Sequence, residues 1–250
     1  MTSAGVDPTT GDRSANPAEV GWSAGSTMAG LVGAALAVSA WGLGSVLAKA
    51  ITMGGLAIAV YRFLIFFVGL AVWMQVRNTR FSLTAFRKSI WGGLALAADV
   101  AFFFSAIKLT SVINATLIGA LQPVLVGVVA ARFFGERIRP RDAFWSLLAL
   151  AGVAGVILTG SDSGVSDFRG DLLAVGALIS WSAYFIASKQ SKGRMTTTEF
   201  TAGSSLWTGL LNLPLAVAFG QDLSLPGQRD LLLVLLMTLV AGVLGHSAMN

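Results

Sequence analysis

Apolar runs of roughly 20 residues recur from one end of this sequence to the other, and a helix of that length crosses about 30 Å of hydrocarbon. Hydrophobic residues make up 55% of the 250 residues and charged residues only 12%. That leaves too little polar surface to coat a water-soluble protein of this size. Strands with open edges would leave backbone groups without hydrogen-bond partners in lipid. The sequence therefore predicts an all-α polytopic membrane protein.

The positions of the apolar runs define eight membrane spans. They are expected at residues 28–49, 55–76, 89–107, 113–134, 142–160, 171–189, 199–219 and 231–250. Residues 1–27 contain no apolar run and are rich in Gly, Ser, Thr and Pro, a composition that is typical of disordered segments. We therefore expect a disordered cytoplasmic tail at 1–27, directly before the first span.

The basic residues are divided unevenly between the two sides of the membrane. With the N-terminus inside, the inner segments hold twelve of them: Arg13, Arg77, Arg80, Arg87, Lys88, Arg132, Arg137, Arg139, Arg141, Lys189, Lys192 and Arg194. The outer segments hold four: Lys49, Lys108, Arg169 and Arg229. Cytoplasmic loops carry the excess of Lys and Arg in membrane proteins, so the N-terminus is expected in the cytoplasm. The same clustering accounts for the net charge of +5 without a nucleic-acid partner.

An internal repeat relates residues 30–49 to residues 170–189 at an offset of 140 (181 − 41 = 140). The matched pairs are Gly30 with Gly170, Trp41 with Trp181, and Lys49 with Lys189. The first unit, 28–160, would hold five helices, and the second, 170–250, would hold three. Because five is an odd number, the second unit enters the membrane upside down relative to the first. Inverted repeats of this kind are typical of secondary transporters.

Several short motifs resemble those of the drug/metabolite transporter superfamily, specifically its EamA-like members. The most specific stretch is 105–158, with Pro123 midway along the fourth span, the letters GER at its inner end, and a Gly-rich fifth span. The letters YRF at 61–63 are similar to the Arg-containing start of the family's second helix. The resemblance covers roughly residues 28–250. It implies two inverted five-helix halves, termini in the cytoplasm, and export of small metabolites.

The expected family fold has ten helices, whereas about eight are found here. A second, weaker match pairs residues 98–104 with 244–250 at an offset of 146 (244 − 98 = 146). At that offset, the counterpart of 105–160 would fall at 251–306, beyond the sequence. The expectation is a truncated form or a variant, with a dimer or a partner chain as possible sources of the other helices.

Two aromatic pairs are candidates for a solute-binding cavity. Trp41 and Trp181 lie in the middle of their spans, away from the interfaces where Trp usually gathers. A Trp at that depth needs either a partner for its indole N–H or a cavity to face, and ordinary helix packing is the alternative. Tyr184 and Phe103 are weaker candidates on the same grounds.

Asp99 and Arg62 are charged residues within apolar spans. An acidic group at the depth of Asp99 costs about 2.5–3.5 kcal/mol, so it should face protein or water and serve a function. Burial favours the neutral form of a carboxyl group, which would suit a proton carrier. The alternative for Asp99 is a structural pair with Arg62. Arg62 could bind an anionic solute or extend its charge toward the interface.

Asn114 and Gln122 are polar residues of the fourth span that need hydrogen-bond partners. Pro123 removes a backbone hydrogen bond beside them and is expected to bend the helix. Both polar residues could line the cavity, or they could form hydrogen bonds with backbone groups at the bend.

The function predicted from these features is secondary transport of a small amino-acid-like or drug-like solute, as efflux by alternating access, with Asp99 as the proton-coupling group. The protein would be a multi-pass protein of the plasma (inner) membrane, with lipid and a small-molecule solute as partners. No Walker motif points to ATP, no cofactor is implied, and the lack of Cys with a single His argues against a metal site or an enzyme. A non-transporting scaffold or accessory subunit and an intramembrane enzyme remain the alternatives.

Overall fold

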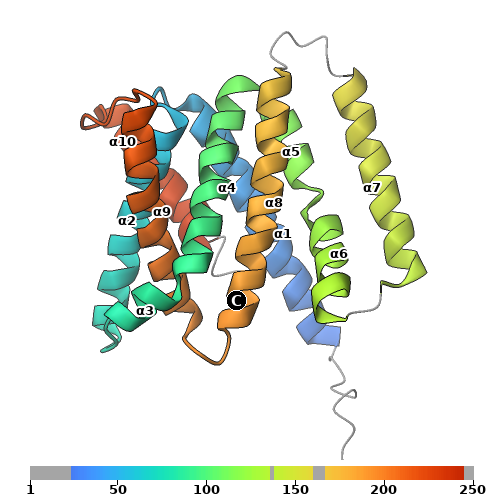
Figure 1. The fold of residues 1–250 in the computed structure, drawn as a ribbon, viewed down its shortest axis with the longest axis horizontal. Coiled ribbons are helices and arrows are strands. Elements are labelled where there is room, and N and C mark those ends of the chain that lie inside the picture. Colours follow the sequence, from blue (N-terminus) through green and yellow to red (C-terminus); the bar gives the residue numbers. More distant parts are fainter. Residues whose placement is uncertain (1–23, 136–137, 160–166, 245–250) are drawn as a thin grey trace, which may run out of the picture.

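The computed structural model describes residues 24–135, 138–159 and 167–244, and this part of the chain is helical without strands (Figure 1). The helices are α1 (Ala24–Ala50), α2 (Gly55–Val76), α3 (Leu83–Lys88), α4 (Ile90–Leu109), α5 (Val112–Gly119), α6 (Gln122–Phe134), α7 (Pro140–Thr159), α8 (Phe168–Ser191), α9 (Thr197–Ala218), α10 (Gln228–Met237) and the π-helical segment η2 (Thr238–Leu244).

Four helical stretches of the described residues are long and apolar enough to cross a bilayer. They are Gly55–Val76, Ile90–Leu109, Val112–Val129 and Phe168–Ser191. The prediction of an all-α membrane protein is therefore confirmed.

The helices alternate in direction, and the two repeat units are inverted. In Figure 1, α1 rises from the lower face of the bundle whereas its repeat counterpart α8 descends from the upper face. Trp41 of α1 and Trp181 of α8 meet through their side chains, whose ring centres are 5.4 Å apart. The tryptophans that the repeat matches in sequence are thus direct neighbours in space.

Side-chain caps fix where several helices begin, as expected for hydroxyl and carboxylate residues at this position. Ser82 and Ser111 accept hydrogen bonds from the backbone of the first turns of α3 and α5. The start of α9 carries a full capping box, in which Thr196 and Glu199 each satisfy the other's backbone N–H. These caps set the helix starts next to the short turns between spans.

Apart from shifts of up to three residues at helix ends, the predicted elements differ from the structure at four places. Residues 24–27, assigned to the tail, belong to α1; the rest of the tail, 1–23, lies outside the described residues. The short helix α3 between the second and third spans was missed. The fourth span divides into α5 and α6 just before Pro123, as the proline predicted. The last span changes from α10 to π-helix at Thr238, and its final residues 245–250 are outside the described part.

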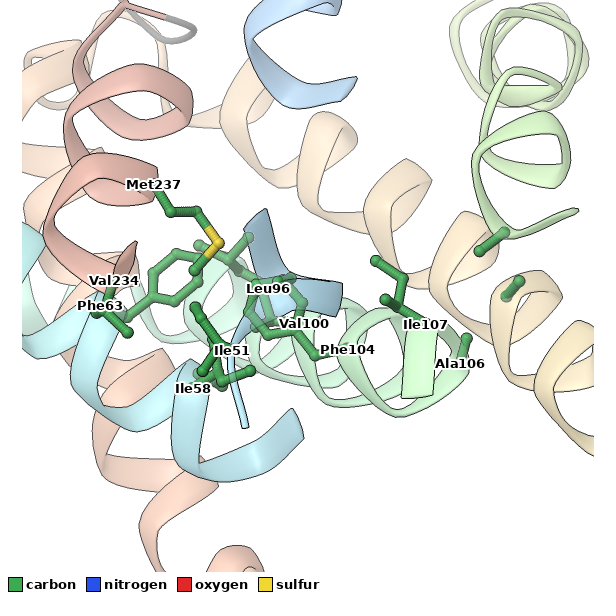
Figure 2. Close-up of a cluster of buried hydrophobic side chains, with 14 of the residues drawn as sticks. Ile51, Ile58, Phe63, Leu96, Val100, Phe104, Ala106, Ile107, Val234 and Met237 are labelled. Carbon is green, nitrogen blue, oxygen red and sulfur yellow. The ribbon is translucent and has the colours of Figure 1, made fainter. Parts of the chain in front are cut away.

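The apolar core lies where α2, α4 and α10 meet the end of α1. Figure 2 shows Phe63 of α2, Val100 and Phe104 of α4, and Val234 and Met237 of α10 in this cluster. All five side chains are at most 4% exposed. This cluster holds α2 and α4 in place beside the cavity described next.

Candidate functional site

A cavity of about 500 Å³ lies between the two inverted units. Its walls come from α1, α2, α4, α5, α6, α8 and η2. The lining residues include Trp41, Gly44, Arg62, Phe63, Leu96, Asp99, Val100, Phe103, Phe104, Thr116, Gly119, Ala120, Gln122, Ala174, Ala177, Leu178, Trp181 and Ala241. The volume falls within the range of small-molecule sites, about 300–1,000 Å³.

The two repeat-related tryptophans form one wall of the cavity. Their rings meet edge to face, with an interplanar angle of 77°, an arrangement that aromatic quadrupoles favour. The Trp41 indole donates to the backbone oxygen of Ala241 in η2 at 3.2 Å. The Trp181 Nε1 is buried and has no hydrogen-bond partner among the described residues. The two tryptophans therefore occupy equivalent positions in the repeat but differ in their hydrogen bonding.

Arg62 lies at the cavity wall against two aromatic rings. Its guanidinium carbon is 5.0 Å from the ring centre of Phe63 and 5.6 Å from that of Phe104. Cations in this position gain about 0.5–2 kcal/mol from the ring faces. The aromatic contacts hold the side chain in place and leave its N–H donors available.

Asp99 faces the same cavity from α4, within electrostatic range of Arg62. In the part of the chain that the structure describes, the two groups form no direct ion pair, which would require a nitrogen and an oxygen within 4.0 Å. Each side chain is only partly exposed, and the cavity borders both. The site therefore contains a guanidinium group and a carboxyl group that are close but form no ion pair with each other.

Gln122 contributes the polar group at the break between α5 and α6. The break places Gly119 and Ala120 at the cavity wall beside it. On the preceding turn, the Thr116 hydroxyl donates to the backbone oxygen of Val112 at 2.7 Å. The helix break indicated by Pro123 thus lies at the cavity wall.

Two of the eight candidate residues are not among those that line the cavity. Asn114 is buried near the N-terminal end of α5, and its side-chain amide donates to Asp171 at 3.4 Å. Tyr184 packs between Trp181 and Phe200, with ring centres 5.2 and 5.6 Å away. The structure therefore brings Trp41, Arg62, Asp99, Phe103, Gln122 and Trp181 together, with Tyr184 directly behind them.

The apolar wall residues of α4 were missed by the sequence analysis. Leu96, Val100 and Phe104 share one face of α4 with Asp99 and Phe103. Positions three, four and seven residues apart in a helix lie on one face. The signal was therefore available once Asp99 had been chosen as a reference point, although apolar residues at lipid-facing and cavity-facing positions look alike in a membrane span.

Comparison with known proteins gives consistent matches. A family model described as the EamA-like transporter family matches residues 28–158 and 168–250. The aromatic amino acid exporter YddG of Ancylobacter novellus is 35% identical over 116 residues, which cover 44% of this chain and 39% of that protein. A solved structure, described only as the crystal structure of a protein, is 25% identical, with a TM-score of 0.65 over 89% of this chain and 78% of that chain. The matched region thus spans about two fifths of the length of the curated relative.

Proposed function

The chain belongs to the EamA-like transporter family, and on that premise we propose that it moves an amino-acid-like solute with an aromatic side chain across the plasma membrane. The observation that carries the proposal is the unpaired Arg62 and Asp99 in an aromatic cavity between the inverted units. Substrate sites of such folds lie between the repeats near the bilayer midplane. The likeness to an aromatic amino acid exporter supports the same class of solute.

The chemistry of the site fits a zwitterion with a ring. Arg62 can bind a carboxylate with two parallel hydrogen bonds, a geometry that its planar guanidinium favours. Asp99 can accept hydrogen bonds from an ammonium group, and the edge-to-face pair of Trp41 and Trp181 offers contacts for an aromatic ring. A bound solute would thus satisfy both charges, whose exposure to a low-dielectric environment is otherwise unfavourable.

The proposed mechanism is alternating access, with export from the cytoplasm as its direction. The N-terminus is placed in the cytoplasm by the excess of Lys and Arg on that side. Asp99 is the proposed proton-coupling group: a protonated carboxyl no longer attracts an ammonium, so a proton and the solute compete for it. Proton entry from outside would then favour solute release there.

A thermal-shift assay of the purified protein in detergent tests this proposal. The panel contains aromatic amino acids, aliphatic amino acids, nucleosides, sugars and organic cations, each at acidic and neutral pH. A ligand at 100 times its Kd stabilises the folded protein by about 2.7 kcal/mol. We expect aromatic amino acids to raise the melting temperature of the parent protein more at neutral than at acidic pH.

Matched variants separate the site from general stability. Asp99→Asn should remove the pH dependence, and Arg62→Gln should abolish the shift. Asp142→Asn is the control, because Asp142 lies exposed in the first turn of α7, outside the cavity. A flat response to the whole panel, or equal shifts in the parent and Arg62→Gln, would contradict the proposed solute class.

A further inference from the structure

The outer end of α1 is tied to the outer end of α4 by Lys49. This lysine lies in the last turn of α1, and its Nζ donates to the backbone oxygens of Ile107 and Thr110, the latter at 3.0 Å. Carbonyl groups at a helix C-terminus have no partner within their own helix and carry partial negative charge that attracts cations. Lys49 therefore caps the neighbouring helix and not its own.

Lys108 makes the reciprocal contact. It lies in the last turn of α4, and its Nζ donates to the backbone oxygens of Ala48, at 2.9 Å, and Ile51. Each lysine thus caps the helix that carries the other. In Figure 1 both helices rise to the same face of the bundle, so the exchange joins their ends on the side opposite the described start of α1.

Two carboxylates extend this connection to α8 and α10. Asp230, in the first turn of α10, accepts from the backbone N–H of Thr52 at 3.1 Å and from its hydroxyl. Asp171, in the first turn of α8, accepts from the Thr110 hydroxyl at 2.7 Å and from Asn114 at 3.4 Å. The ends of α1, α4, α5, α8 and α10 are therefore joined by one set of hydrogen bonds.

Close backbone contact accompanies these bonds at the same end of the bundle. A Cβ added to Gly170 would lie 2.7 Å from the Thr110 Cβ, and one added to Gly55 would lie 2.7 Å from the carbonyl carbon of Phe104. Such distances are well inside normal van der Waals contact. The helices are thus packed closely above the cavity.

We infer that Lys49 and Lys108 form the outer gate of the transport pathway. With both cross-caps made, the outer end is closed; the outward-open state requires each ammonium to leave the partner helix. The inference rests on the proposed carrier function and orientation, but it concerns residues outside the cavity and is independent of the solute.

The energetics suit a closure that can be reversed. Hydrogen bonds to a charged group are stronger than those between neutral groups, yet on separation both the ammonium groups and the carbonyls would reach the outer aqueous interface. The two like charges repel each other, and Asp230 is the carboxylate that offsets this repulsion at Lys108. Closure is therefore stable only while all of these groups remain together.

Side-specific labelling of a single cysteine tests the gate, because the parent sequence contains no cysteine. Gly119 is a suitable reporter position: it lines the cavity, and an added Cβ would meet nothing within 4 Å. The Gly119→Cys protein is treated with a membrane-impermeant maleimide from outside in intact cells and from the cytoplasmic face in inside-out vesicles. We expect slow labelling from outside and faster labelling from the cytoplasmic face.

Removing the caps should open the outer side. Lys49→Met and Lys108→Met, each in the Gly119→Cys background, should raise the outside labelling rate several-fold, while Lys49→Arg, which keeps the charge and donors, should stay near the parent rate. Lys189→Met is the matched control, because Lys189 is the repeat counterpart of Lys49 at the opposite face. If the Met variants cannot be recovered folded, Lys49→Gln replaces them. Its outside labelling rate should lie between that of the parent and that expected for the Met variants.

The melting temperature of each variant, measured in detergent, separates a gate from a purely structural cap. A lower melting temperature with an unchanged outside labelling rate would overturn the inference. Fast outside labelling of the parent would also overturn it. Because no solute is added, a failure of this experiment is distinguishable from a failure of the proposed solute class.

Discussion

The two tryptophans at positions 41 and 181 occupy equivalent places in the repeat but have different hydrogen-bonding environments. The Trp41 indole N–H has a backbone acceptor in η2, whereas the Trp181 Nε1 is buried without a partner among the described residues. A hydrogen bond of this type contributes about 0.5–1.5 kcal/mol to stability. Trp41 therefore stabilises the fold through a hydrogen bond as well as through its ring, whereas Trp181 contributes only its ring to packing and to the cavity wall.

Replacement of each tryptophan by phenylalanine should reveal this asymmetry. Trp41→Phe loses both ring area and the bond to Ala241, so it should lower the melting temperature by several degrees. Trp181→Phe loses ring area but no hydrogen bond and removes an unsatisfied donor, so its loss of stability should be smaller. Thermal unfolding in detergent measures both, and equal losses would contradict the assigned bonding.

Residue identities alone indicated six of the residues that line the cavity and left most of the lining undetected. Charged groups and tryptophans at mid-span depth are unusual in lipid, so Asp99, Arg62, Trp41 and Trp181 could be selected from the sequence. Asn114 carries a similar signal, but its amide is used near the outer end, because Asp171 reaches it from another helix. A partner so distant in sequence cannot be found from local pattern.

At the scale of elements, the start of α2 approaches the C-terminal part of α4 closely through Gly55. A Cβ there would lie 2.7 Å from the carbonyl carbon and 2.8 Å from the oxygen of Phe104. Backbone atoms cannot rotate away as side chains can, so a methyl group forces the two helices apart. Elsewhere in α2, Gly69 faces open space, with nothing within 4 Å of an added Cβ.

Replacement of Gly55 and of Gly69 by alanine should therefore change the stability of the protein in opposite directions. Gly55→Ala should destabilise the protein by about 1–3 kcal/mol, the usual cost of overpacking. Gly69→Ala should be neutral or stabilising by up to about 1 kcal/mol, because alanine favours helix more than glycine does. Denaturant or thermal unfolding of the two variants provides the comparison, and a stable Gly55→Ala protein would argue against the close approach.

Helix positions were predictable from apolar run length, but their internal breaks were less so. Pro123 correctly indicated a break in the fourth span, because proline cannot donate the backbone hydrogen bond. The π-helical segment Thr238–Leu244 has no such marker, and α3 is only six residues long. Ser82 was the available signal for α3, since its hydroxyl caps that helix.

At the scale of the whole molecule, the alternating helices place the connections of the second unit on opposite faces. The α8–α9 connection lies on the lower face in Figure 1 and the α9–α10 connection on the upper face. The excess of Lys and Arg predicts that the lower face is the cytoplasmic one. On this prediction the lysine cross-caps lie at the outer face of the membrane.

Cysteines at two exposed positions test the orientation directly. Leu225, in the α9–α10 connection, is 88% exposed, and Lys192 lies exposed at the end of α8. In intact cells, an impermeant maleimide should label Leu225→Cys and leave Lys192→Cys unmodified, because only the former reaches the outer solution. Both should react after the membrane is permeabilised, which controls for access and expression. Labelling of Lys192→Cys alone in intact cells would reverse the orientation, and the Lys49–Lys108 contact would then close the cytoplasmic end of the pathway.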